Sequence, residues 1–248
     1  LFKRNIMQAN YKAYDFEKSR DRIDEILNSS DNNYEDKKEI PSRDNLTFTN
    51  GYYIFCSAIF IDMRGSKEFS KKHTRPVTAK IYRSYISELI AVLNGNTRLR
   101  EIYIEGDCVW GVFNSPKKSD IDSIFSTAAQ AASIIDTLNV KLRKKNYSEI
   151  KAGIACHDAD VLMIKAGYSG SGINEVTWIG KLVGETADLC SKANRSDSER
   201  TLYSQTFYNN LTDENKKKMD WLNWNTTYEC YEGDTINSKM NEWVQKNG

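Results

Sequence analysis

The sequence lacks the features that would place it in a membrane, secreted or nucleic-acid-binding class. No apolar run approaches the ~20 residues needed to span a bilayer, and the longest covers residues 52–61. No secretory signal is visible, although the chain starts at Leu1 rather than Met. A net charge of +1 gives no general basic surface for nucleic acid or anionic lipid. We therefore expect a cytoplasmic protein with neither nucleic acid nor membrane as a partner.

Cysteine is scattered through the chain. The five cysteines include no Cys-x-x-Cys pair, so the sequence indicates no zinc site. Cys56, Cys108 and Cys156 lie in apolar, strand-like runs. Small buried thiols of this kind are typical of a reducing compartment.

The first fifty residues are mostly polar. Residues 10–28 place a few apolar side chains among many charges, a pattern that predicts an amphipathic helix. Residues 29–50 contain few apolar side chains and are expected to form a linker or long loop. We therefore divide the chain into an N-terminal helix with a polar linker at 1–50 and a folded domain at 51–248.

The remaining residues predict a mixed α+β domain. Residues 52–61 are continuously apolar, as in a central strand. Pro76 opens a helix with an apolar residue at every fourth position from Ile81. Gly106-Asp107 separates two strands, at 100–105 and 108–113, and indicates a hairpin. The later expected elements are a helix at 119–145, strands at 150–157 and 160–165 joined by a polar turn, a loop at 167–172, a strand at 175–179 and a helix at 184–193. The last fifty residues are expected to mix short elements and to end in an exposed tail. This order predicts a ferredoxin-like βαββαβ fold with a C-terminal β/α extension.

Two aspartates stand at the ends of predicted strands. Asp62 ends the apolar strand before a turn, and Asp107 lies at the hairpin tip. In a ferredoxin-like sheet these ends can lie side by side, where two carboxylates would repel unless cations lay between them. Mg²⁺ prefers such oxygen ligands together with substrate phosphates. Alternatively, Asp107 only serves its turn and Asp62 only caps a helix. Each residue alone favours that alternative, whereas the pair favours a metal site.

Four segments resemble the class III nucleotidyl cyclases, and they occur in that family's order. They are Ile59-Phe-Ile-Asp-Met-Arg-Gly-Ser66, Ile104-Glu-Gly-Asp-Cys-Val-Trp110, Lys151-Ala-Gly-Ile-Ala-Cys-His157 and Val176-Thr-Trp-Ile-Gly-Lys-Leu-Val183. They are similar, in turn, to the metal-binding strand, the Gly-Asp hairpin, a Gly-Ile-x-x-His strand and the run before the last catalytic helix. The resemblance covers roughly residues 51–205 and implies that 51–248 is a cyclase catalytic domain.

This resemblance implies a two-metal site. Two Mg²⁺ or Mn²⁺ ions would bind Asp62, Asp107 and the Met63 carbonyl. One would activate the ribose 3′-hydroxyl for attack on the α-phosphate and the other would hold the phosphates. Gly65 and Ser66 are expected to bind the substrate. The family pairs its subunits head to tail with each site at the interface, so a homodimer is implied.

The base-selecting positions depart from those of purine cyclases. Those enzymes carry Lys or Glu four residues before the hairpin aspartate, and Asp or Cys further along; this chain has Tyr103 and Thr177. The Tyr103 ring would fill space that a purine needs, and both hydroxyls can donate or accept hydrogen bonds. Alternatively, Tyr103 is a strand aromatic facing the core, an interpretation of equal weight. The combination resembles the bacterial Pycsar cyclases, which make cyclic UMP or cyclic CMP as an antiphage signal read by a separate effector.

A second departure concerns the transition state. Gly184 and Asp188 stand where the family has Asn and Arg, and neither can replace them. Lys192 lies one helical turn beyond Asp188 on the same face, so it is expected to reach the developing charge in catalysis. Arg195 and Lys165 are further candidates. The alternative, slightly favoured for Lys192 itself, is a solvated helix lysine.

These features predict an enzyme that converts UTP to 3′,5′-cyclic UMP and diphosphate. The alternatives within enzymes are a cytidylate cyclase, acting on CTP, and an adenylate cyclase. A third alternative is an inactive cyclase-like module that binds nucleotide and only regulates. Gly184 and Asp188 favour that module, whereas the retention of both Asp62 and Asp107 favours the enzyme. No Gly-Gly-Asp-Glu-Phe run is present, which separates the chain from that class of proteins with the same sheet topology.

Overall fold

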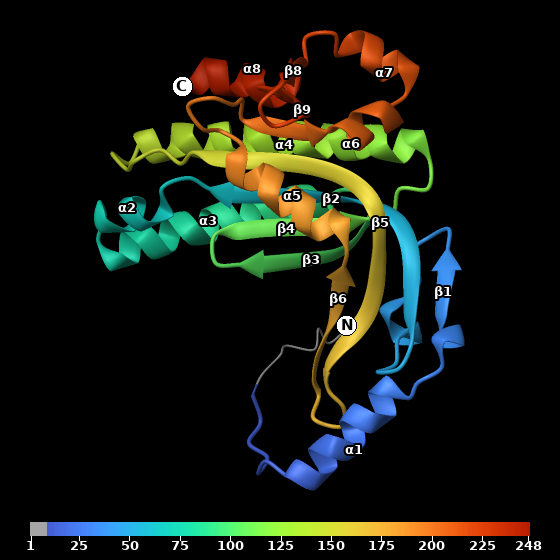
Figure 1. Ribbon diagram of the computed structural model, residues 1–248. Coiled ribbons are helices and arrows are strands. Elements are labelled where there is room, and N and C mark those ends of the chain that lie inside the picture. Colours follow the sequence, from blue (N-terminus) through green and yellow to red (C-terminus); the bar gives the residue numbers. More distant parts are fainter. Residues whose placement is uncertain (1–8) are drawn as a thin grey trace.

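One twisted sheet organises residues 9–248, the part of the chain that this computed structural model describes (Figure 1). Its strands are β1 (Tyr34–Lys37), β2 (Gly51–Met63), β3 (Leu99–Glu105), β4 (Cys108–Phe113), β5 (Ala152–Tyr168), β6 (Ile173–Ile179), β7 (Thr201–Ser204), β8 (Asn223–Asn225) and β9 (Cys230–Gly233). The helices are α1 (Phe16–Leu27), α2 (Ser66–Lys71), α3 (Arg75–Asn94), α4 (Lys118–Arg143), α5 (Lys181–Lys192), α6 (Gln205–Asn210), α7 (Asp213–Lys218) and α8 (Ser238–Asn247). Within residues 9–248, no helix is both long and apolar enough to cross a membrane.

The centre of the sheet has the ferredoxin-like arrangement that the sequence predicts. The strands follow the order β3-β4-β2-β5, and β2 is antiparallel to both β4 and β5. Helix α3 connects β2 to β3, and α4 connects β4 to β5, which completes the βαββαβ unit. Strands β7, β9 and β8 continue the sheet beyond β5. The predicted α+β class and its C-terminal β/α extension are therefore confirmed.

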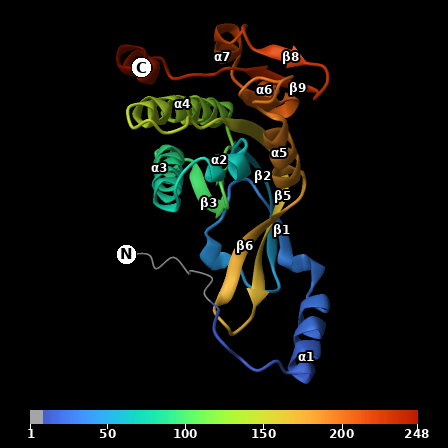
Figure 2. The same ribbon diagram turned by 90° about the vertical axis from the view of Figure 1, so that its left-hand side faces the viewer.

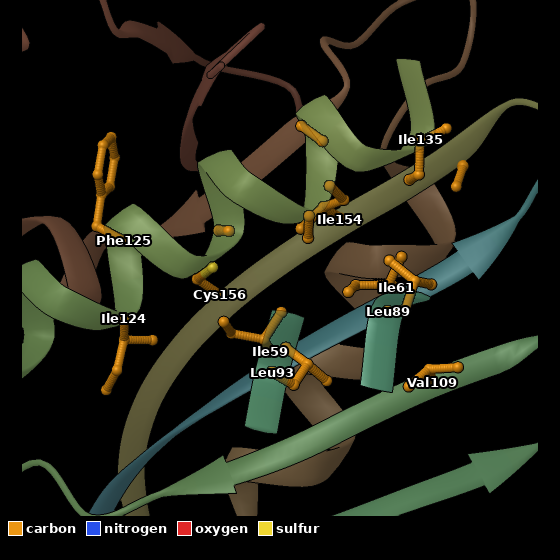
Figure 3. Close-up of a cluster of buried hydrophobic side chains, with 14 of the residues drawn as sticks. Ile59, Ile61, Leu89, Leu93, Val109, Ile124, Phe125, Ile135, Ile154 and Cys156 are labelled. Carbon is orange, nitrogen blue, oxygen red and sulfur yellow. The ribbon is translucent and has the colours of Figure 1, made fainter. Parts of the chain in front are cut away.

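Apolar side chains pack on both faces of the sheet. Successive residues of a strand point to opposite faces, so Ile59 and Ile61 of β2 face α3 and α4, whereas Phe60 belongs to a second cluster with Leu182 of α5. Figure 3 shows Ile59 and Ile61 beside Leu89 and Leu93 of α3. Figure 2 shows α3 and α4 on one side of the sheet and α5 on the other. The apolar repeat predicted from Ile81 to Leu93 is therefore the buried stripe of α3.

The long strand β5 and its partner β6 extend past the helices as an arm (Figure 1). Helix α1 lies at the end of this arm, where the guanidinium of Arg22 is 4.5 Å from the centre of the Tyr168 ring. None of the residues of α1 is buried by the rest of the described chain. The amphipathic helix expected from the sequence therefore forms, but its apolar face is uncovered in the single chain.

The polar segment before β2 is more ordered than predicted. The expectation of a loop through residues 29–50 is wrong at β1, which pairs in parallel with the start of β2. The few apolar residues of the segment serve as anchors, because Ile40 and Leu46 are buried. The Asn114 side chain also accepts a hydrogen bond from the Ile40 amide at 2.9 Å. Strand pairing through the backbone needs no apolar pattern, so sequence reasoning missed β1. The division of the chain at residue 50 stays a prediction.

Strand β5 is continuous where two strands joined by a turn were expected. Residues Asp158 and Ala159 pair with Ser57 and Cys56 of β2 without interruption. The polar run was interpreted as a turn because Asp158 favours turns, yet its side chain is fully buried. Its carboxylate accepts a hydrogen bond of 2.8 Å from the Asn210 side chain. Tertiary contacts thus hold an aspartate in the middle of a strand.

Asp158 should make the stability of the protein depend on pH. Burial raises the pKa of its carboxyl from 3.8 to about 6. Because the folded pKa exceeds the unfolded value, the free energy of unfolding is highest below pH 3.8, where both states hold the proton. It falls as pH rises through about 6, where the buried carboxyl ionises. Asp158→Asn keeps an acceptor for Asn210 and cannot ionise. The free energy of unfolding of the variant should therefore exceed that of wild type by up to about 3 kcal/mol at neutral pH and equal it at about pH 4.

Urea unfolding of both proteins across this pH range measures the effect. The exposed Asp220 provides a control, since Asp220→Asn should leave the wild-type pH profile in place. If the free energy of unfolding varies with pH in the same way in Asp158→Asn and wild type, the pH dependence does not come from Asp158.

The C-terminus is also more ordered than expected. Residues 238–247 form α8, which begins after the capping side chain of Asn237 and has no buried residue, so the end of the chain is helical as well as exposed. Its Trp243 ring lies 4.9 Å from the ammonium of Lys141 on α4. Packing against α4, rather than its own periodicity, accounts for this helix. Helix α5 similarly begins at Lys181, earlier than predicted.

Candidate active site

The structure brings Asp62 and Asp107 to the same end of the sheet. Asp62 is the penultimate residue of β2, and the next residue back, Ile61, pairs with Val109 of β4. Asp107 lies in the β3–β4 turn, where Gly106 takes a left-handed conformation with φ of 65°. Burial and then the charge of Asp107 raise the pKa of the Asp62 carboxyl. The two carboxylates are therefore close enough to repel.

The donor atoms at this end of the sheet fit a divalent cation. Two carboxylates supply hard oxygen ligands of the kind that Mg²⁺ and Mn²⁺ take. Beneath them the Tyr85 hydroxyl is buried and has no hydrogen-bond partner among residues 9–248. Burial and then the charge of Asp62 raise the pKa of that hydroxyl. The Met63 side chain belongs to the core, so only its backbone carbonyl could serve as a ligand. Residues 9–248 contain no group of three or more His, Cys, Asp or Glu able to hold a metal.

Gly65 and Ser66 lie in the turn that directly follows Asp62 and the end of β2. Gly65 has φ of 67° and precedes α2, which begins at Ser66. A glycine is favoured there because other residues rarely adopt this conformation. The Tyr82 hydroxyl lies 3.5 Å from the Ser66 carbonyl oxygen. Both residues predicted to bind substrate are thus close in the chain to Asp62.

Tyr103 is held by its own subunit. Its ring stacks on Trp110 with ring centres 4.1 Å apart. Its hydroxyl donates to the Val176 carbonyl at 2.9 Å and accepts from the Trp178 indole at 2.9 Å. The ring packs against the cluster on the α5 face of the sheet, as strand alternation predicts. Tyr103 is therefore both a packing residue and part of the surface that joins β3 to β6.

The structure does not bring the Thr177 side chain to Tyr103. Its neighbours Val176 and Trp178 are buried in the cluster that Tyr103 contacts. Thr177 lies between them in β6, so its side chain points to the opposite face. Trp178, not Thr177, meets the Tyr103 hydroxyl. The contact of Tyr103 and Thr177 with one base was expected across two subunits, so it stays a prediction.

Helix α5 carries the positions that depart from the family pattern. A side chain at Gly184 would meet open space. Asp188 binds the ammonium of Lys192 at 2.6 Å, and that ammonium also lies 5.4 Å from the Tyr228 ring centre. Lys192 is thus paired with the acidic residue at the expected Arg position. Burial and the charge of Asp107 raise the pKa of Asp62. Arg195, just beyond α5, lies near enough to Asp62 for its positive charge to offset part of that rise.

The remaining cation candidate lies elsewhere. Lys165 belongs to the arm strand β5, and its ammonium is 5.2 Å from the centre of the Phe48 ring.

One residue of the site was missed by sequence reasoning. The Arg64 guanidinium donates to Asp62 Oδ2 at 2.7 Å, and its side chain is only 6% exposed. An arginine in a turn is normally solvated, so nothing local signals this burial. The contact partners lie more than a hundred residues away on α5.

Comparison with known proteins supplies the family. No protein-family model matches the chain. The chain is 38% identical to a uridylate cyclase from Treponema porcinum over 94% of this chain and 82% of that protein. It is 36% identical to a uridylate cyclase from Gulbenkiania mobilis over 97% of this chain and all of that protein.

Solved structures agree on the fold. A class III adenylyl cyclase-like ATP-binding protein from Pseudomonas aeruginosa matches with a TM-score of 0.68 and 14% identity, over 91% of this chain and 48% of that chain. The guanylyl cyclase Cya2 matches with a TM-score of 0.58 and 16% identity, over 66% of this chain and 81% of that chain. Fold and sequence together show that the chain belongs to the uridylate cyclase family and is a nucleotidyl cyclase with the class III fold.

Proposed function

We propose that the protein converts UTP to 3′,5′-cyclic UMP and diphosphate. The observation that carries the proposal is its identity of 36–38% with two uridylate cyclases over nearly the whole chain. The close approach of Asp62 and Asp107 supports an active enzyme rather than a regulatory module. A binding module that needs no catalytic metal would gain nothing from two adjacent carboxylates, which destabilise each other.

The catalytic end of the sheet would work through two divalent ions. Asp62, Asp107 and the Met63 carbonyl would hold Mg²⁺ or Mn²⁺, whose chemistry is to acidify a bound hydroxyl and to neutralise phosphoryl oxygens. The protein's own contribution is to bring both carboxylates to one end of the sheet, where Arg64 donates a hydrogen bond to Asp62. The turn at Gly65 and Ser66 would orient the triphosphate beside them. Phosphoryl transfer depends mainly on such positioning and on electrostatic stabilisation.

Cations near the carboxylates would stabilise the leaving diphosphate. Arg195 is exposed, and only its Nε and backbone amide are used in hydrogen bonds within residues 9–248. Its charge acts on the Asp62 region. Lys192 would contribute only after leaving Asp188, so Arg195 is the better placed of the two. A fixed positive charge lowers the activation barrier most when it lies where negative charge accumulates during the reaction.

Selection of the base would depend on Tyr103. The Trp110 ring beneath it and the Trp178 indole beside it fix its position. A rigid ring occupies volume that the larger purine would need. Because the hydroxyl already bonds within its own subunit, exclusion by the ring supports pyrimidine selection better than a direct hydrogen bond does.

We further propose a homodimer with a site at each interface. The arm and its surroundings expose large apolar side chains, including Tyr53, Ile104, Tyr168 and Ile179. Tyr53, Phe55 and Ile179 line one hollow of the surface, and apolar side chains gathered in this way are typical of protein interfaces. The resemblance to Pycsar cyclases extends the proposal to an antiphage second messenger, read by a separate effector.

The direct test is product identification. The purified protein is incubated with each of the four ribonucleoside triphosphates and Mn²⁺, and cyclic products are identified by mass spectrometry. We expect cyclic UMP from UTP, with at least about tenfold less product from the purine substrates. Cyclic CMP as the main product would instead identify CTP as the substrate. Nucleotide binding without any cyclic product would favour the regulatory module.

A further inference from the structure

Arg64 connects the metal-binding end of β2 to the far end of α5. Its Nη1 donates to Asp62 Oδ2 at 2.7 Å. Its Nε donates to the Ala193 carbonyl at 2.8 Å, and its Nη2 donates to the Cys190 carbonyl. Both carbonyls belong to the C-terminal turn of α5, where the helix dipole favours a positive charge. One buried guanidinium thus satisfies a carboxylate and two helix-end carbonyls.

The neighbouring strand is shaped to admit this guanidinium. Gly153 of β5 pairs with Asp62 across the sheet. A Cβ at position 153 would overlap Arg64 Nη2 and lie 2.7 Å from the Ala193 carbonyl oxygen. The backbone oxygen cannot move aside as a flexible side chain can. Glycine at 153 therefore leaves the space that Arg64 occupies, which indicates a fixed position for the guanidinium.

We propose that Arg64 is a positioning residue that holds Asp62 in the orientation required to bind a divalent cation and fixes the end of α5 against it. The inference rests on the proposed function, since it assigns the metal to Asp62. Charge-assisted hydrogen bonds to a carboxylate are among the stronger ones in proteins. Partners that orient a metal ligand typically contribute about 10–100-fold to metal affinity or activity.

The three bonds need an arginine rather than another cation. A guanidinium directs its donors in fixed, divergent directions, whereas an ammonium is a point charge on a flexible stem. Arg64 uses Nε, Nη1 and Nη2 for three different acceptors. Lysine at this position would keep the charge near Asp62 but lose the connection to α5.

The test compares variants that disturb this contact in different ways. Arg64→Met removes the charge, Arg64→Lys keeps it, and Gly153→Ala displaces the guanidinium without changing any charge. Arg200→Met is the matched control, because Arg200 is also mostly buried and pairs with Asp136 at 2.7 Å and Asp234 at 2.5 Å. Binding of Mn²⁺ alone is measured by electron paramagnetic resonance of the free ion. Melting temperature and kcat and KM for UTP are measured in parallel.

Arg64→Met and Gly153→Ala should each raise the Kd for Mn²⁺ by at least about tenfold, with a smaller rise for Arg64→Lys. Arg200→Met should lower the melting temperature while leaving that Kd unchanged. An unchanged Kd in Arg64→Met, an equal rise in Arg200→Met, or absence of Mn²⁺ binding by wild type would each overturn the inference. If wild type forms no cyclic nucleotide but its Mn²⁺ affinity depends on Arg64 as expected, the positioning role holds and the proposed function falls.

Discussion

Asp62→Asn and Asp107→Ala are each expected to reduce cyclic nucleotide formation by more than about a hundredfold, or ~2.7 kcal/mol in the activation barrier. A two-metal site that loses one carboxylate cannot hold both the attacking and the leaving oxygen. Asparagine is preferred at position 62 because it keeps an acceptor for Arg64, whose guanidinium would otherwise lose a partner in a buried place. Initial rates with UTP and Mn²⁺ measure the effect, and thermal unfolding verifies that both variants are folded.

Retention of more than about a tenth of wild-type activity, ~1.4 kcal/mol in the barrier, would be incompatible with the two-metal assignment. Mixing variants tests the composite site as well. An Asp62→Asn chain and a Lys192→Ala chain should together recover activity if Lys192 acts on the partner's substrate. A fully active monomer by sedimentation would exclude the interface site.

Tyr103→Ala is expected to lower the ratio of kcat/KM for UTP to that for ATP by at least about tenfold. The substitution removes the ring that a purine would have to displace. It also removes the stack on Trp110 and leaves the Trp178 indole without its acceptor, so the free energy of unfolding should fall by about 3–5 kcal/mol. Tyr103→Lys should move the preference further toward purines.

Tyr103→Phe separates the two contributions of this side chain. It keeps the ring and loses the bonds to Val176 and Trp178. If the ring alone excludes purines, the ratio should change by less than about threefold while stability falls by about 1–3 kcal/mol. A loss of stability in Tyr103→Ala with no change in the ratio would identify Tyr103 as a core aromatic only.

The elements that depend mainly on residues close in the sequence were predicted correctly. The β3–β4 hairpin was predicted from Gly106-Asp107, because a two-residue turn leaves few alternatives. The repeat in α3 was predicted because the apolar period matches the helix. Strand order followed from the sequence of these elements, and it places Asp62 and Asp107 at one end of the sheet.

Long-range contacts account for what was missed. Strand β5 was divided because Asp158 resembles a turn residue, whereas Asn210 from α6 stabilises it inside a strand. The burial of Arg64 depends on α5, which is remote in sequence. No local pattern reports such contacts.

The unbroken course of β5 has a mechanical consequence for the arm. Its pairing with β2 runs without a shift from Met63↔Ala152 to Gly51↔Ile164, so core and arm share one ladder of backbone hydrogen bonds. The arm therefore has no hinge in β5, and swinging it would require breaking that ladder. A second subunit would meet a surface already formed before contact, and docking would proceed as an encounter of rigid bodies. Association should then be limited by orientation during diffusion rather than by a slow change of shape in either chain.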